Sequence, residues 1–231
     1  MNYILFDGPF RIALLPFTYT RPVADIRFGI LTIREKWELY LGSTTTTITE
    51  DYLVSKFPMV ELGENTLINA SYTPNDNLVE MIQNLKPKQV IYDGEVVVAF
   101  RATETQSEID FEAFEPLFYP ASTLSVKNSW AIFQHNGAAI EADFDLITKN
   151  RTSQPIPEKV VSFNESQIFI EEGAQLPLCV LNATNGPIYI GKDTEIMEGC
   201  MIRGPFALCE NSILKMSTKI YGPTTIGPHS K

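Results

Sequence analysis

Five basic side chains lie close together near the start of a strongly acidic chain. They are Arg11, Arg21, Arg27, Arg34 and Lys36. Only two acidic residues lie among them, although the 231 residues together carry a net charge of -10. Arginine suits anion binding because its planar guanidinium group can contact two phosphate oxygens at once. This local excess of positive charge predicts a binding site for a small anionic ligand.

The remaining charge and hydropathy patterns exclude other classes of partner. A net charge of -10 argues against nonspecific binding of nucleic acid, whose phosphate backbone is held by summed positive charge. No apolar run approaches the ~20 residues that a membrane span needs, and residues 1–7 lack the basic start of a signal peptide. We therefore expect a cytoplasmic protein with no membrane and no nucleic-acid partner.

A six-residue repeat fills the C-terminal end of the chain. No α-helix has this period, whereas one flat side of a triangular parallel coil does, with three sides and about 18 residues in a turn. The repeat predicts a left-handed parallel β-helix of hexapeptide repeats over residues 161–231, and a β-sandwich is the alternative. The positions expected to point inward are all aliphatic: Ile190, Ile196, Ile202, Leu208, Leu214, Ile220 and Ile226.

Two irregularities interrupt this repeat. The spacing slips by two residues between Leu176 and Ile190, which predicts an irregular first turn. The chain ends at Lys231, in the middle of a six-residue unit, so we expect the β-helix to be incomplete and further repeats to follow in the natural protein. Three cysteines in this part, Cys179, Cys200 and Cys209, lack the spacing of a zinc site and are expected to be reduced and buried.

Residues 1–150 carry alternating strand and helix signals, which predict an α/β domain. Residues 1–6 form an apolar strand and residues 90–98 a hairpin with Asp93-Gly94 near its turn. A capping box and apolar spacing predict helices over residues 33–41 and 76–85. The polar segment 151–160, which two prolines interrupt, is the expected linker.

Several stretches resemble a known enzyme family. Leu15 to Pro22 resembles the segment PLTxTRPK, which follows the glycine-rich loop of sugar-1-phosphate nucleotidylyltransferases. Thr20 to Trp37 fits the pattern TRPVAxxRxGILTIxEKW of a divergent group, the probable sugar nucleotidyltransferases or glucose-1-phosphate thymidylyltransferases. Gly186 to Glu210 fits their pattern GPIYIGxxxEIMEG…RGPFALCE. The resemblance implies a nucleotidyltransferase-like, Rossmann-like domain followed by a hexapeptide β-helix, as in the bifunctional N-acetylglucosamine-1-phosphate uridylyltransferases.

The resemblance implies transfer of a nucleotidyl group from a nucleoside triphosphate to a hexose 1-phosphate, with release of pyrophosphate. Positioning and charge neutralisation dominate such chemistry, and Mg²⁺ is the expected cofactor. Arg11 and Arg21 would be the catalytic residues on the triphosphate. Substrate binding would involve Arg27, Arg34, Gly8, Thr20 and Asn69. A homotrimer formed through the β-helix is also implied.

The chain departs from the family pattern at the positions where metal and phosphates should bind. The first loop, Asp7 to Arg11, has one glycine and a proline, which removes an amide donor. Asn69 stands where the family has the aspartate that binds magnesium. Asp7, Asp143 and Asp145 are the candidate replacements, although Asp7 could instead form a turn and the other two could be solvated.

Three functions therefore remain open. The first is a sugar-1-phosphate nucleotidylyltransferase in which the arginines bind phosphate, although Arg34 could instead pair with Glu38 on a helix surface. The second is acyl transfer by the complete β-helix, for which His229 would be the catalytic candidate. The third is a noncatalytic protein that binds a sugar nucleotide and organises a trimer. The single loop glycine favours this third function.

Overall fold

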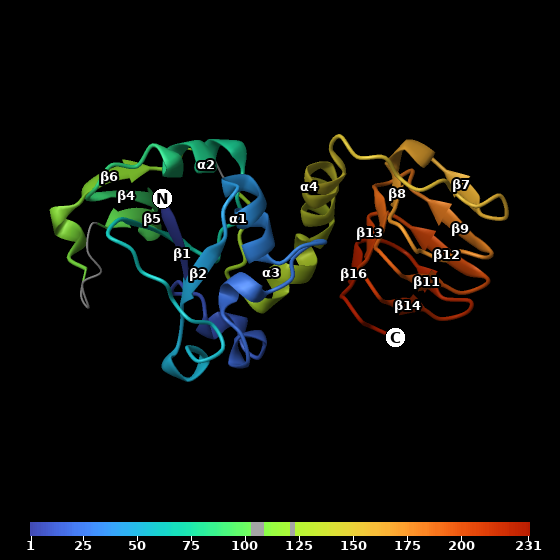
Figure 1. Ribbon diagram of the computed structural model, residues 1–231, viewed down its shortest axis with the longest axis horizontal. Helices are drawn as coiled ribbons and strands as arrows, with labels where there is room; N and C mark the ends of the chain where they lie inside the picture. The colour runs from blue at the N-terminus through green and yellow to red at the C-terminus, as the bar shows by residue number, and fades with distance from the viewer. Residues whose placement is uncertain (103–108, 121–122) are drawn as a thin grey trace. The chain divides into compact units, whose positions relative to one another are not determined.

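The computed structural model describes residues 1–102, 109–120 and 123–231 (Figure 1). They divide into two compact units. The first comprises Met1–Ile26 and Thr32–Ala131, and the second comprises Arg27–Leu31 and Ile132–Lys231. No helix among the described residues is long and apolar enough to cross a membrane.

A six-stranded sheet forms the first unit, in the order β2-β1-β3-β5-β4-β6. Only β5 runs antiparallel to its neighbours, so the other five strands end at the same edge. The strands are β1 (Asn2–Phe6), β2 (Thr45–Ile48), β3 (Asn65–Asn69), β4 (Gln89–Asp93), β5 (Val96–Ala102) and β6 (Glu115–Phe118). The predicted first strand and hairpin are confirmed.

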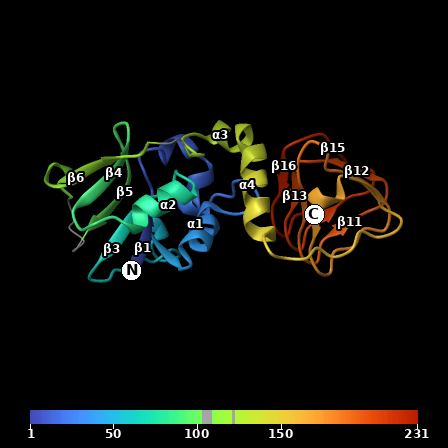
Figure 2. The same cartoon turned by 90° about the horizontal axis from the view of Figure 1, so that it is seen from above.

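Two helices, α1 (Ile33–Leu41) and α2 (Asp76–Gln83), contact each other in this unit (Figure 2). The predicted capping box begins α1, because the Thr32 side chain accepts a hydrogen bond from the Glu35 backbone while Glu35 accepts one from Thr32. The fully buried Trp37 indole of α1 donates to the Tyr72 carbonyl oxygen at 2.9 Å. Both helices are therefore confirmed, although α2 ends two residues earlier than expected.

Residues 161–231 contain parallel strands in three sheets, and we call this region the C-terminal coil. From β10 onward the chain passes once through each sheet and then repeats the same order, as the stacked strands of Figure 1 show. The strands are β7 (Val161–Phe163), β8 (Ile168–Ile170), β9 (Cys179–Asn182), β10 (Ile188–Ile190), β11 (Glu195–Ile196), β12 (Cys200–Arg203), β13 (Phe206–Leu208), β14 (Ile213–Leu214), β15 (Lys219–Ile220) and β16 (Thr224–Ile226).

Strand register gives this coil the predicted turn length. Ile188 pairs with Phe206, and Phe206 pairs with Thr224, 18 residues further on each time. The first turn is longer, since Ile168 pairs with Ile188, which confirms the expected irregularity. All seven aliphatic positions of the repeat belong to one apolar cluster, five of them as buried residues and Ile220 and Ile226 as partly buried ones.

The division into units differs from the expected boundary at residue 150. Helix α4 (Asn136–Thr148) and the segment Arg27–Leu31 both group with the coil. Ile30, Ile140 and Phe144 share an apolar cluster with Phe169 and Ala207 of the coil, and this burial explains the grouping. The short helix α3 (Ser129–Gln134) spans the division at residue 131.

The expected linker, residues 151–160, is attached to the coil rather than extended from it. Arg151 forms an ion pair with Glu171 at 2.7 Å, and the Gln154 backbone donates to the Ile170 carbonyl oxygen at 2.8 Å. Ile156 packs against the apolar interior of the coil. The segment contains no helix or strand, and Arg151, Gln154 and Ile156 contact the coil.

Candidate functional site

The carboxyl ends of the parallel strands in the first unit bring the loop Asp7–Arg11 beside the segment Thr49–Asp51. The loop follows β1, and the segment follows β2, its neighbour in the sheet. From β1 the chain goes to β2 on one side, and β3 lies on the other side. Ligands of open α/β sheets bind at such a change of direction, outside the carboxyl ends of the strands.

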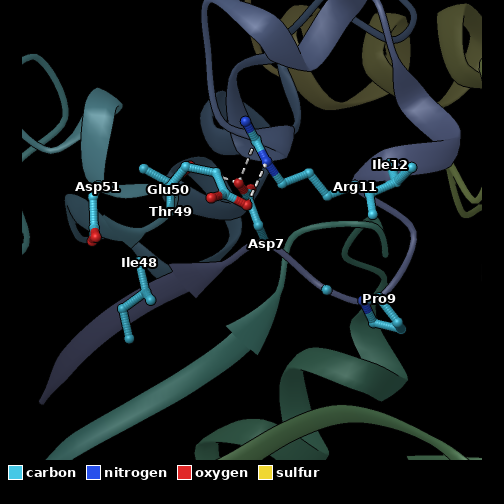
Figure 3. Close-up of a pocket in the computed structure, with 9 residues that line it drawn as sticks. Asp7, Pro9, Arg11, Ile12, Ile48, Thr49, Glu50 and Asp51 are labelled. Atoms are coloured by element: carbon cyan, nitrogen blue, oxygen red, sulfur yellow. Dashed lines mark hydrogen bonds and ion pairs between the residues drawn. The ribbon is translucent and has the colours of Figure 1, made fainter. Parts of the chain in front are cut away.

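A cavity of about 440 Å³ lies at this edge (Figure 3). Its lining contains one cation, Arg11, and three acids, Asp7, Glu50 and Asp51. The remaining lining residues are uncharged: Gly8, Pro9, Ile12, Ile48 and Thr49. The cavity lining is therefore net acidic, whereas the cluster of basic residues in the sequence predicted a positively charged site.

Arg11 is almost completely occupied by neighbouring protein groups. It donates to the Asp7 carboxylate at 2.7 Å, to the Thr18 carbonyl oxygen at 2.6 Å and to the Tyr52 hydroxyl at 2.9 Å. Its Nε lies 3.3 Å from Glu50 (Figure 3). Because its side chain is only 11% exposed, Arg11 fixes the loop and has little capacity left to bind a phosphate.

Asp7 uses both carboxylate oxygens to hold the surrounding backbone and side chains. Oδ1 accepts from the Val23 backbone at 2.7 Å, whereas Oδ2 accepts from Arg11 and, at 2.6 Å, from the Thr49 hydroxyl. A cation bound here would have to displace the positively charged Arg11. Asp7 therefore does not fit the role of a magnesium ligand, and its structural role exceeds that of a simple turn residue.

Gly8 and Asn69 meet at the carboxyl ends of β1 and β3. A Cβ atom on Gly8 would lie 2.4 Å from the Asn69 side-chain oxygen, so a larger residue here would require the Asn69 side chain to move. That oxygen accepts from the Ser71 backbone at 3.0 Å, and the Asn69 amide nitrogen donates to the Val97 carbonyl oxygen at 3.0 Å. Asn69 is fully buried and connects neighbouring strands.

Arg34 belongs to α1, and its guanidinium group contacts Asp25 and residues of β2. Its guanidinium binds both oxygens of Asp25, at 2.8 and 3.2 Å, and it also donates to the Thr45 carbonyl oxygen and the Thr47 hydroxyl. Glu38, its alternative partner in the sequence, accepts instead from Thr45. The pairing with Glu38 is therefore wrong, and Arg34 has a structural ion pair of a different kind.

Thr20 and Arg21 follow a short 3₁₀ helix, Phe17–Tyr19, in the same unit. Both residues are exposed. Across the described parts of the chain, Arg21 makes no hydrogen bond or ion pair. It is therefore the predicted phosphate-binding arginine whose guanidinium is available to a ligand.

The structure places Arg27, Asp143 and Asp145 in the second unit. Arg27 donates to the Ile30 carbonyl oxygen. Asp143 is 2% exposed and accepts from the backbone N–H groups of Ile30 and Leu31, at 2.8 and 3.0 Å. Asp145 is exposed on the same helix.

These carboxylates form no metal centre. Asp143 is already bonded to backbone donors, whereas Asp145 is solvated, as its alternative interpretation expected. Within residues 1–102, 109–120 and 123–231, no group of three or more His, Cys, Asp and Glu side chains could hold a metal ion.

A second group of polar residues at the carboxyl edge was missed in the sequence. The Tyr72 hydroxyl donates to Asp93 Oδ2 at 2.8 Å, and Lys127 Nζ lies 3.2 Å from the same oxygen. Lys127 also lies over the rings of Tyr72 and Phe10, 5.1 and 5.6 Å from their centroids. Asp93 ends an apolar strand, and this position was the one available signal.

Neighbouring side chains keep the Asp93 carboxylate ionised. The hydrogen bond from Tyr72, and then Lys127, lower the pKa of Asp93 despite partial burial. Burial, followed by the bond to Asp93, raises the pKa of Tyr72. At neutral pH the Asp93 carboxylate is therefore ionised and the Tyr72 phenol is protonated.

Among curated proteins, none matches the chain. The sequence model of one family, described as sugar nucleotidyl transferase, matches residues 3–152, which is well over half of the chain. This chain therefore belongs to the sugar nucleotidyl transferase family.

Proposed function

We propose that this protein transfers a nucleotidyl group from a nucleoside triphosphate to a hexose 1-phosphate. A phosphate oxygen of the sugar would attack the α-phosphorus, a new P–O bond would form, and the bond to the bridging oxygen would break as pyrophosphate leaves. The observation that carries this proposal is the fixed loop Asp7–Arg11 at the carboxyl end of β1, in a chain of this family.

The residues of this edge would have separate roles in that reaction. Arg21, exposed and without a protein partner among the described residues, would neutralise the phosphates. Arg11 and Asp7 would be positioning residues, because their mutual ion pair fixes the loop. Glu50 and Asp51 make the cavity acidic, so the triphosphate would bind more favourably as its magnesium complex than as a bare anion.

Pyrophosphate release tests the proposal directly. The full chain would be incubated with each common nucleoside triphosphate, a panel of hexose 1-phosphates and Mg²⁺. Arg21→Ala should lower kcat/KM about 10- to 100-fold, because a hydrogen bond to a charged group is worth ~1.5–3 kcal/mol. Arg203→Ala, which removes an exposed arginine from the coil, should leave kcat/KM unchanged. Complete inactivity across the panel would contradict the proposal.

A noncatalytic sugar-nucleotide-binding protein is the second candidate. This candidate is favoured because Arg11 and Arg34 both form ion pairs with carboxylates of the protein, which neutralise their charge. Calorimetric binding of a nucleoside triphosphate or sugar nucleotide without any pyrophosphate release would support this candidate. Turnover would exclude it.

For the second unit, we propose that the C-terminal coil is a left-handed parallel β-helix of hexapeptide repeats that organises a homotrimer. The 18-residue strand register and the buried aliphatic positions support the β-helix. One face of the coil exposes Phe163, Met201 and Tyr221, which supports association. Sedimentation equilibrium should give three times the chain mass, and a monomer at micromolar concentration would overturn the trimer.

A further inference from the structure

Lys127, Asp93 and Tyr72 form a second polar site at the carboxyl edge, which we call the lysine site. Asp93 is the last residue of β4, and Tyr72 comes three residues after β3. Backbone pairing of Val126 with Ser71, at 2.7 Å, holds the segment that carries Lys127 against the end of β3. The lysine site therefore lies at the same edge of the sheet as the loop Asp7–Arg11.

The ammonium group of Lys127 is held in place while still exposed. Asp93 binds it from one side, and the rings of Tyr72 and Phe10 lie within 5.6 Å of it. An ammonium has three donors, and Asp93 uses one of them. Since the lysine side chain is 36% exposed, the remaining donors can reach a ligand. Phe10 belongs to the loop after β1, so the ammonium also lies beside that loop.

Asp93 has a free acceptor on the same side chain. Its Oδ2 accepts from both Tyr72 and Lys127, whereas Oδ1 accepts from no residue that the structure describes. The Asp93 side chain is 43% exposed. Tyr72 is buried and fixes the orientation of the carboxylate, so Oδ1 is presented in one direction.

A purely structural explanation accounts for this arrangement less well. Ion pairs that are this exposed contribute little to stability. The two other basic residues described above as fixed, Arg11 and Arg34, each donate to several protein oxygens. Lys127 donates to one carboxylate alone in the described structure and keeps its other donors for solvent or a ligand.

We propose that the lysine site binds the hexose 1-phosphate, with Lys127 on the phosphate and Asp93 on a sugar hydroxyl. An ammonium matches a phosphate, a carboxylate accepts from hydroxyl groups, and the partly buried Phe10 ring offers an apolar surface to the C–H face of a sugar. This inference rests on the proposed function, because it supplies the acceptor substrate of that reaction.

Binding measurements on the full chain test the lysine site without requiring turnover. Calorimetry would use the hexose 1-phosphate that wild type binds most tightly, and inorganic phosphate in parallel. Lys127→Met should weaken both ligands about tenfold or more, because charge-assisted hydrogen bonds are lost. Lys127→Arg should restore part of the affinity. Lys86→Met, a lysine change just before β4 at the opposite edge, should change neither affinity.

A variant at Asp93 distinguishes binding of the sugar from binding of the phosphate group. Asp93→Asn should weaken binding of the hexose 1-phosphate but not that of inorganic phosphate, since phosphate offers no sugar hydroxyl. Equal effects on both ligands would overturn the role of Asp93. Unfolding curves of each variant would show whether it is folded at the assay temperature.

The possible failures are distinguishable. Wild-type affinity for the sugar phosphate in folded Lys127→Met would overturn the lysine site and leave the proposed reaction intact. Normal binding to the lysine site without pyrophosphate release would instead contradict the proposed reaction. If wild type binds a nucleoside triphosphate and no hexose 1-phosphate at millimolar concentration, the lysine site has no such ligand and the inference fails.

Discussion

The carboxylate of Asp143 accepts a hydrogen bond of 2.8 Å from the backbone N–H of Ile30, a residue 113 positions earlier in the chain. The same oxygen accepts from Leu31 at 3.0 Å. Next to them, Gly29 has a φ of +84°, and a Cβ there would lie 2.5 Å from Asp143. The segment Arg27–Leu31 is thus built around this carboxylate within the second unit.

Removing the Asp143 carboxylate should destabilise the second unit. In Asp143→Ala the N–H groups of Ile30 and Leu31 lose their acceptor, which should lower the free energy of unfolding by about 2–4 kcal/mol. Asp145→Ala changes an exposed aspartate of the same helix and should shift it by less than about 0.5 kcal/mol. Urea unfolding followed by circular dichroism measures both, and equal stability of the two variants would show that the bonds contribute nothing.

The fold was predictable where the signal in the sequence was local. The burial of Ile190, Ile196 and Ile202 follows from a six-residue period, because each strand of the coil repeats the environment of the previous one. The start of α1 followed from the capping box of Thr32 and Glu35, which requires only neighbouring residues. Such features need no knowledge of distant contacts.

The candidate site was less predictable because charges were counted without their partners. The basic cluster omitted Asp7 and Glu50, which lie outside it in sequence and neutralise Arg11 in the structure. Arg34 binds Asp25, nine residues earlier, through a loop whose path the sequence does not reveal. The lysine site joins residues from three separated segments, so no sequence spacing could identify it.

The contact between Gly8 and Asn69 should make Gly8 sensitive to the smallest substitution. In Gly8→Ala the new methyl group overlaps the Asn69 side chain, which is fixed by two hydrogen bonds, so stability should fall by about 1–3 kcal/mol. Gly63→Ala is the matched control, since a Cβ there meets nothing within 4 Å. Thermal unfolding compares the two. A neutral Gly8→Ala would mean that Asn69 moves freely.

Arg11 and Arg21 should separate stability from ligand binding. Arg11→Met leaves the buried Asp7 carboxylate without its cation, which should lower the free energy of unfolding by about 3–5 kcal/mol. Arg21→Ala should leave stability within about 0.5 kcal/mol of wild type, because Arg21 is exposed. Triphosphate binding should instead weaken in Arg21→Ala, whereas the folded fraction of Arg11→Met should bind the triphosphate about as tightly as wild type. If Arg11→Met is fully stable, the ion pair does not fix the loop.

Cys179 should make the coil less stable at alkaline pH. Burial, with a smaller contribution from Cys200, raises the pKa of the Cys179 thiol from its ordinary value of 9.0 to about 11. Between these values the unfolded chain loses the thiol proton and the folded chain keeps it, so the stability contributed by the neutral thiol is complete below pH 9 and is lost as the pH rises to 11.

In Cys179→Ala this loss is absent. The stability difference between wild type and Cys179→Ala should therefore shift against wild type by ~1.4 kcal/mol per pH unit in this window. Urea unfolding from pH 8 to 11 measures the difference, and parallel curves would show that the folded thiol ionises as easily as the unfolded one.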